Sequence, residues 1–251
     1  MKEILQRITE KKEQLDSLRP FPTELDKNLY EWFKVALTYS SNAIEGNTLT
    51  LAETAQVVEK NITVSGKSIV EHLEAINHAK AVDFIQYLAK TKNRAQLTLD
   101  YILEIHRIIL HKINDEWAGR LRMMAVRVVG SPVPCPNYMK VPELIDGLVS
   151  LMTSSQNHIA TIAAQAHLEL ASIHPFVDGN GRTARLLMNL LLLQEDYPLV
   201  IIDAKDRTAY INSIQKALQG DSTDYYQFIY QAIEHSLDEY IAAAHESELT
   251  S

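Results

Sequence analysis

Two strongly apolar segments flank a short glycine-containing turn in the second half of this chain. The first, residues 159–173, is apolar nearly all round, which is the pattern of a helix buried on every side. Pro175 follows where that helix should end. The second begins at Arg182 and has the same buried pattern, with leucines at Leu186, Leu187, Leu190 and Leu191. Two buried helices joined by a tight turn predict a mainly helical fold.

The turn itself, residues 174–185, reads H-P-F-V-D-G-N-G-R-T-A-R. Gly179 and Gly181 allow backbone conformations that other residues avoid, so the N–H groups of the turn can approach a ligand. Because the turn leads into a helix N-terminus, unpaired N–H groups and the positive end of the helix dipole should form an anion site. Arg182 and Arg185 share one helix face, and their planar guanidinium groups suit phosphate oxygens.

Two further side chains in the turn add chemistry to this anion site. His174 is the residue type that most often acts as a general base near neutral pH. Asp178 offers the single carboxylate with which proteins often hold Mg²⁺ beside phosphates. Taken alone, the Asp-Gly-Asn-Gly run would be an ordinary interhelical turn. A metal triad that adds His167 is disfavoured, because His167 lies in an apolar stretch and is expected to be a core histidine.

The same string matches the motif H-P-F-x-D-G-N-G-R-x-x-R of Fic domains at all of its specified positions, and the chain therefore resembles that family. The resemblance implies transfer of AMP from ATP to a hydroxyl side chain of a target protein, with ATP as co-substrate and Mg²⁺ as cofactor. It implies that His174 deprotonates the hydroxyl and that Asp178 binds Mg²⁺. Phe176 is expected to fill the core beneath the loop. The other motif residues are implied in nucleotide binding: Gly179, Asn180 and Gly181 as a phosphate cradle, and Arg182 and Arg185 as clamps on the β- and γ-phosphates.

A second string lies far upstream, where residues 41–47 read S-N-A-I-E-G-N. Ser41, Glu45 and Gly46 match the pattern [S/T]xxxE[G/N], which resembles the inhibitory motif of many Fic proteins. A carboxylate carried to Arg185 would pair with the guanidinium that otherwise holds the γ-phosphate. The same residues would also suit a plain helix end capped by glycine. The inhibitory interpretation predicts that Glu45 lies within ion-pair distance of Arg185.

Apolar periodicity predicts helices through most of the remaining chain. The apolar faces are Leu29, Trp32, Phe33, Ala36 and Leu37; Leu99, Ile102, Leu103, His106, Ile109, Leu110 and Ile113; Leu144, Ile145, Leu148, Val149 and Met152; Tyr210, Ile211, Ile214 and Leu218; and Tyr226, Ile229, Ile233, Leu237 and Ile241. Only residues 123–129 have the pattern of a strand. In Fic domains a β-hairpin flap lies here and binds the target segment by strand addition. We therefore expect an all-α Fic fold with one small β-hairpin.

The chain of 251 residues is expected to divide near residues 91–95. Residues 1–95 would form an N-terminal helical module with the inhibitory motif, and residues 96–251 the catalytic core. Tyr210 lies where similar proteins place an aromatic residue against adenine. Its neighbours Ile211 and Leu218 are apolar, so UTP or another nucleotide remains an alternative to ATP.

Bulk properties limit the partners. A formal charge of −8 and an isoelectric point near 5.6 disfavour nucleic acid. Cys135 is the only cysteine, which excludes an internal disulfide, and its place between two prolines suggests a loop rather than a nucleophile. The sequence has no run of membrane length and no signal peptide, so a cytoplasmic location is expected. Self-modification and a homodimer both remain open.

Two functions from different classes fit these observations. The first is an autoinhibited protein adenylyltransferase, which could also remove AMP with Glu45 orienting water, as family members with an inhibitory glutamate can. The second is a nucleotide-binding regulatory module that Glu45 holds shut. The intact His174 favours the enzyme, because a module that only binds nucleotide has no use for a base.

Overall fold

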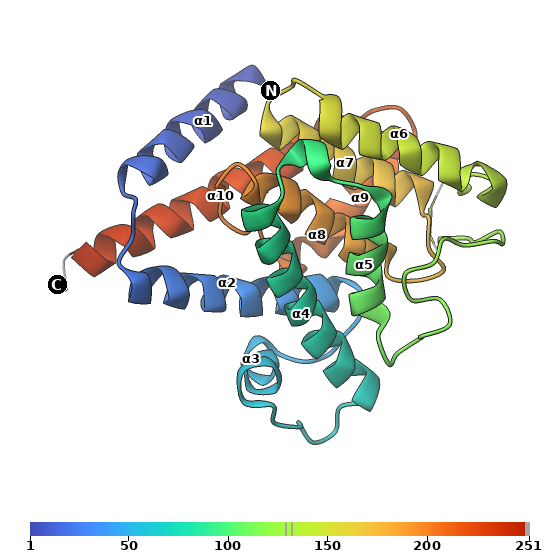
Figure 1. The fold of residues 1–251 in the computed structure, drawn as a ribbon, viewed down its shortest axis with the longest axis horizontal. Coiled ribbons are helices and arrows are strands. Elements are labelled where there is room, and N and C mark those ends of the chain that lie inside the picture. The colour runs from blue at the N-terminus through green and yellow to red at the C-terminus, as the bar shows by residue number, and fades with distance from the viewer. Residues whose placement is uncertain (129, 132, 249–251) are drawn as a thin grey trace.

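The computed structural model describes residues 1–128, 130–131 and 133–248 and shows a bundle of helices (Figure 1). The α-helices are α1 (Lys2–Ser17), α2 (Thr23–Ile44), α3 (Leu51–Lys60), α4 (Ile69–Thr91), α5 (Leu99–Leu110), α6 (Val141–Ser154), α7 (Ile159–Ile173), α8 (Asn180–Leu193), α9 (Arg207–Leu218) and α10 (Thr223–Glu248). Short 3₁₀ turns are η1 (Arg94–Gln96), η2 (Tyr138–Lys140) and η3 (Ala204–Asp206). The predicted helices are confirmed, except that Ile113 lies beyond the end of α5.

Helices α7 and α8 form the centre of the bundle, as their apolar sequences predicted (Figure 1). They pack against each other, and α6 and α10 cover α7 while α4 and α5 cover α8. Almost every side chain of α8 is buried, including all four predicted leucines. The turn between the two helices is therefore supported by two closely packed, buried helices.

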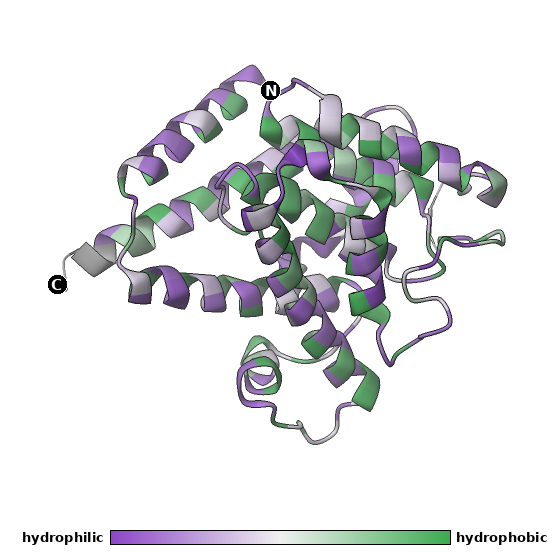
Figure 2. Ribbon diagram, in the orientation of Figure 1, coloured by the Kyte–Doolittle hydropathy of each residue, from purple (hydrophilic) through white to green (hydrophobic). Residues whose placement is uncertain are grey.

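The N-terminal helices pack directly on this centre. One hydrophobic core runs from Ile8 of α1, through Ile85 of α4, to Leu97 and Ile105, and thus continues across residue 95. Hydrophilic residues predominate along the visible sides of α1 and α2 (Figure 2). Helix α2 also packs against α8, and its last turn brings residues 41–45 to the start of α8. This packing brings the two sequence motifs together.

The predicted β-hairpin flap is wrong for the part of the segment that the structure describes. Residues 123–128 have no strand conformation, Val129 lies outside the described residues, and Met123 is 73% exposed. The residues that follow include Pro134 and Pro136, which lack the N–H groups that a hairpin ladder needs. An apolar run alone does not form a strand without a hydrogen-bonding partner.

None of the helices in the described ranges is long and apolar enough to cross a membrane.

Candidate active site

The turn between α7 and α8 is shaped by its own side chains. His174 ends α7 in the left-handed region, with φ 49°, and its N–H donates to the carbonyl of Leu170 at 2.9 Å. Gly179 precedes α8 with φ 76°, a conformation that favours glycine. The buried amide of Asn180 accepts from the N–H of Phe176 at 2.9 Å and donates to the carbonyl of Phe176 at 3.0 Å. Asn180 therefore fixes the turn with its side chain.

Phe176 lies fully buried beneath the turn, as predicted. Its ring stacks on His106 of α5, with 3.7 Å between ring centroids. The N–H of Gly119 donates to Nδ1 of His106 at 3.0 Å, so Nε2 carries the proton and donates to the carbonyl of Asp178 at 2.9 Å. In the sequence, His106 was recognised only as part of an apolar helix face. A histidine on an apolar helix face is the one sequence signal that could have indicated a role for His106 in the site.

Arg122 anchors the turn from the other side, and no sequence motif indicated it. The side chain is buried, and its guanidinium donates to the carbonyls of His174 at 2.8 Å, Met124 at 3.0 Å and Pro136 at 2.7 Å. Its backbone N–H donates to the carbonyl of Pro175 at 2.8 Å. One arginine thus ties Met124 and Pro136 to the turn.

A cavity of about 460 Å³ opens above the turn, within the range of small-molecule sites. Helices α7, α8 and α9, the end of α2 and residues 128, 131 and 133–136 contribute to its wall. Polar lining residues include Glu45, His167, His174, Asn180, Arg185, Arg207, Tyr210 and Gln215, and the apolar ones include Val128, Val133, Ile211, Ile214 and Leu218. The cavity therefore has charged groups at the motif and a mixed polar and apolar wall along α9.

The two distant motifs meet at Arg185. This guanidinium is 2% exposed, and its Nη2 lies 2.8 Å from Oε1 of Glu45, which confirms the predicted contact. Ser41 accepts from the same guanidinium twice, through Oγ and the backbone carbonyl, each at 2.9 Å. Gly46 has φ 102° where α2 has ended, so the segment is both a helix end and a carboxylate carrier. Its regulatory role stays a prediction.

The charge state of Glu45 follows from its neighbours. Burial alone would raise the pKa of the Glu45 carboxyl, but the charge and hydrogen bond of Arg185 outweigh it, with smaller contributions from Arg182 and Arg207. The pKa is therefore below its ordinary value. Glu45 is ionised at neutral pH and competes as an anion for Arg185.

Gly181 is required for space and not for its backbone conformation. It lies in the first turn of α8, and its φ is outside the left-handed region, contrary to the sequence interpretation. A Cβ atom at this position would lie 2.2 Å from Oε1 of Glu45 and 3.1 Å from Nη1 of Arg185. The absent side chain makes room for the Glu45 carboxylate.

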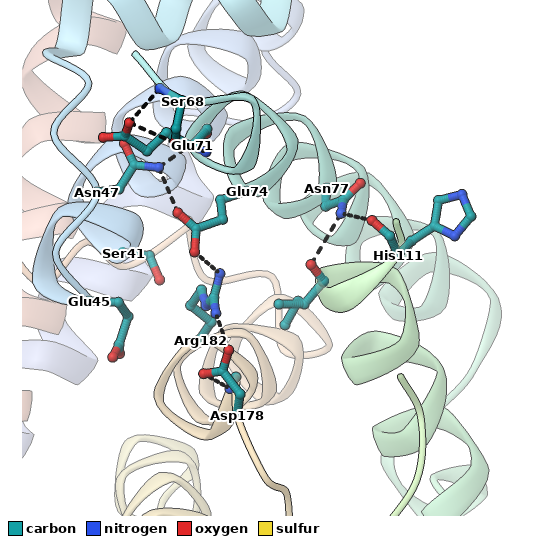
Figure 3. A network of polar contacts seen from close by, with 12 residues as sticks. Ser41, Glu45, Asn47, Ser68, Glu71, Glu74, Asn77, His111, Asp178 and Arg182 are labelled. Carbon is teal, nitrogen blue, oxygen red and sulfur yellow. Dashed lines mark hydrogen bonds and ion pairs between the residues drawn. The ribbon is translucent and has the colours of Figure 1, made fainter. Parts of the chain in front are cut away.

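Arg182 occupies a different environment from Arg185. It is buried, is not among the residues that line the cavity, and its Nη1 donates to Oε1 of Glu74 on α4 at 3.0 Å (Figure 3). Its Nη2 lies 3.6 Å from Oδ2 of Asp178. The Asp178 side chain is 61% exposed, and Oδ1 accepts from the N–H of Gly179 at 2.6 Å. A single exposed carboxylate suits a Mg²⁺ ion that takes its other ligands from water and phosphate.

His174 lies at the cavity wall with its imidazole partly exposed. Burial lowers the pKa of His174, and the charge of Arg122 acts in the same direction. A backbone hydrogen bond to Ala171 and the charges of Glu45 and Asp178 oppose this shift without reversing it. The ring is therefore neutral near pH 7, as a general base must be.

His167 is a core histidine, as predicted. Its Nδ1 bonds to the hydroxyl of Tyr225 and its Nε2 to the hydroxyl of Tyr210, each at 2.7 Å. Both nitrogens are thus used, which excludes the metal triad considered from the sequence. Tyr210 lies in the cavity wall but is only 1% exposed, so a nucleotide could contact only a small part of its ring.

The fold and this site define a helical protein with a Fic-type anion-binding turn, and comparisons with known proteins agree. Residues 96–192 match the model of the Fic/DOC family. A solved structure of Fic-1 (residues 134–508) from C. elegans is 31% identical and has a TM-score of 0.87, over 98% of this chain and 73% of that one. A Fic domain containing signaling protein from Bacteroides thetaiotaomicron is 28% identical with a TM-score of 0.86, over 96% and 98% of the two chains.

The chain belongs to the Fic/DOC family. A curated relative from Nematostella vectensis, named protein adenylyltransferase Fic, is 36% identical over 96% of this chain and 56% of its own length. The chain thus spans about half the length of the curated relatives it matches.

Proposed function

We propose that this chain is an autoinhibited protein adenylyltransferase, which transfers AMP from ATP to the hydroxyl group of a Ser, Thr or Tyr side chain in a target protein. The observation that carries the proposal is that His174, Arg185 and the N-terminus of α8 meet at one cavity. The names of the curated relatives support the same chemistry.

In this reaction the target hydroxyl oxygen attacks the α-phosphorus of ATP. The bond between the α-phosphorus and the oxygen bridging to the β-phosphorus breaks, and pyrophosphate leaves with the electron pair. His174 takes the hydroxyl proton, for which its neutral ring is suited. The N–H groups at the start of α8 and the guanidinium of Arg185 bind phosphate oxygens. Gly179, Asn180 and Gly181 form the turn that presents those N–H groups.

Asp178 is the residue that would hold Mg²⁺. The bound ion would neutralise phosphate charge and stabilise the pyrophosphate leaving group. The Asp178 side chain is 61% exposed, so its carboxylate is accessible to such an ion.

Autoinhibition follows from the competition for Arg185. With Glu45 at 2.8 Å, the guanidinium is paired before any nucleotide arrives, and a γ-phosphate must displace the carboxylate to reach it. Ser41 holds the guanidinium toward α2, and Gly46 ends the helix that carries Glu45. In the reverse direction, Glu45 would orient water for the removal of AMP from a modified target.

The nucleotide base is the least constrained part of the proposal. The wall of the cavity along α9 combines the apolar Ile211, Ile214 and Leu218 with the polar Arg207 and Gln215, and Tyr210 is almost fully buried. This mixed surface does not by itself select one base, so ATP is proposed by similarity and UTP stays an alternative. We also retain, as proposals, the division into residues 1–95 and 96–251 and a cytoplasmic location.

The test is incubation with α-labelled ATP and Mg²⁺, comparing the native chain with Glu45→Gly. We expect Glu45→Gly to label itself or a target, because Arg185 becomes free for phosphate. Adding His174→Ala should lower the labelling by about 10²–10⁴-fold, the usual effect of removing a general base. The control is His235→Ala, an exposed histidine on α10. Labelling that survives His174→Ala would overturn the role of the base, and an excess of unlabelled UTP that competes as well as ATP would reassign the nucleotide.

A second measurement addresses the metal. In the Glu45→Gly background, Asp178→Ala should shift the Mg²⁺ concentration that supports half-maximal labelling to higher values, because the protein ligand is lost. An unchanged Mg²⁺ dependence would place the ligand elsewhere.

A further inference from the structure

We propose that Glu74 is a positioning residue of the nucleotide site, which holds Arg182 in place and couples it to the inhibitory segment. The inference rests on the proposed function and adds to it the contact of Arg182 with the β- or γ-phosphate that the family resemblance implies. Glu74 belongs to neither sequence motif and lies on α4, more than a hundred residues from Arg182 in the sequence.

The contacts of Glu74 are divided between its two oxygens. Oε1 accepts from Nη1 of Arg182 at 3.0 Å, and Oε2 accepts from the side-chain amide of Asn47 at 2.8 Å (Figure 3). The same Asn47 amide donates to the carbonyl of Glu71 at 3.1 Å. Asn47 follows Glu45 by two residues, so a single carboxylate joins the end of the inhibitory segment to a motif arginine.

The burial of Arg182 makes this carboxylate necessary. The guanidinium is 3% exposed, and its Nε has no hydrogen-bond partner among the described residues. A buried charge needs a partner, and Glu74 provides the nearer of two carboxylates. Glu74 holds the Nη1 atom of the Arg182 guanidinium. The Nη2 atom therefore points to Asp178, which is the proposed Mg²⁺ ligand (Figure 3). Glu74 thereby orients Arg182 toward the place where the outer phosphates of a metal-bound nucleotide would lie.

The coupling follows from the shared carboxylate. A movement that withdraws Glu45 from Arg185 also moves Asn47, which releases Oε2 of Glu74. The carboxylate can then turn, and Arg182 with it. The two motif arginines are thus controlled by two carboxylates of the N-terminal helices: Glu45 competes with phosphate for Arg185, whereas Glu74 aims Arg182.

The experiment measures nucleotide binding by calorimetry in the Glu45→Gly background, with Mg²⁺-ATP and with AMP as separate ligands. We expect Glu74→Gln to weaken Mg²⁺-ATP binding about tenfold, the effect of loosening one charge-assisted phosphate contact. AMP lacks the β- and γ-phosphates, so its affinity should not change. A loss of stability alone would not change the ratio of the Mg²⁺-ATP affinity to the AMP affinity.

The matched control is Glu71→Gln. Glu71 lies one turn earlier on α4, carries the same charge, and bonds to Ser68 and Thr48 instead of Arg182. It should lower stability but leave the affinity ratio unchanged. If Glu74→Gln leaves the ratio unchanged while both ligands bind, the positioning role is overturned and the proposed function stands. A Glu45→Gly parent that binds neither ligand overturns the nucleotide site and this role together.

A double-mutant cycle provides an independent test that needs no single variant to be fully stable. Glu74→Gln and Arg182→Gln should be strongly non-additive in Mg²⁺-ATP affinity, because the two side chains are in direct contact. Additive losses would overturn the proposal.

Discussion

The turn at residues 174–181 and the segment of residues 123–128, 130–131 and 133–136 both border the cavity, but different contacts hold their backbones. The turn is fixed mainly by its own residues, because Asn180 binds both backbone groups of Phe176. In the segment, Ser131 bonds to both backbone groups of Val133, and the carbonyls of Met124 and Pro136 accept from the guanidinium of Arg122. The turn lies in a motif that can be recognised from sequence, whereas the contacts that Arg122 makes with the segment have no such signal.

The largest effect is expected from breaking the internal support of the turn. Asn180→Ala leaves the buried N–H and C=O of Phe176 without partners, which should cost about 3 kcal/mol of folding free energy. The displaced turn should also lower AMP transfer about 100-fold in the Glu45→Gly background, as expected when reacting groups are misplaced. Urea unfolding and the labelling assay measure the two quantities.

The control for this variant is Asn189→Ala. Asn189 is also buried on α8 and bonds to the backbone of Arg185 and Val200, away from the turn. It should lose similar stability with much less loss of transfer at a temperature where both variants are folded. Equal losses of transfer would mean that Asn180 acts only through global stability.

A smaller effect is expected from loosening the link between the two regions. Arg122→Lys keeps the charge but loses the planar fork that reaches the carbonyls of His174, Met124 and Pro136. We expect a loss of about 2 kcal/mol in the free energy of unfolding and about a tenfold fall in transfer. The exposed Arg120→Lys should change neither quantity. A full retention of activity in Arg122→Lys would show that the turn does not need the segment.

The central helix under the turn should respond to acid. Burial, and then the charge of Arg185, lower the pKa of His167 from 6.5 to about 3. The unfolded chain therefore binds the proton more readily, and stability is full above pH 6.5 and is lost as the pH falls toward about 3. The slope should reach about 1.4 kcal/mol per pH unit from this one group. Urea midpoints at pH 7 and pH 5 measure it, and a His167→Gln variant with an equally steep slope would contradict the assignment.

The smallest effect is expected in the segment itself. Pro134→Val restores a backbone N–H at an exposed position and should change stability by less than about 0.5 kcal/mol. The same replacement at Pro175 should cost more, because the added N–H would lie at a buried position. Differential scanning fluorimetry is sufficient for the comparison. A large loss for Pro134→Val would indicate that the prolines, and not the anchored carbonyls, order the segment.

Much of the site could be predicted because its residues act on near neighbours in sequence. Long apolar runs located α7 and α8, and the burial of Phe176 followed from its place beneath a turn. The contact between Glu45 and Arg185 could be predicted only because each residue lies in a recognisable string.

The residues that were missed act through the fold. Arg122, His106 and Glu74 reach the turn from three separate elements, and each is an ordinary residue in its local sequence. The segment 123–128 was misread because an apolar run gives no information on whether a partner strand exists. Long-range partners are a property of packing, which a single sequence does not encode locally.

The missing side chain of Gly181 has an evolutionary consequence. Every glycine codon becomes an alanine codon by one base change, and the added methyl group would occupy the place of the Glu45 carboxylate. If the proposed inhibition operates, a lineage could lose it through a single methyl at Gly181 while the motif histidine and arginines stay intact. The proposed inhibition would then depend on an absent side chain, which mutation can add far more easily than it can rebuild a catalytic group.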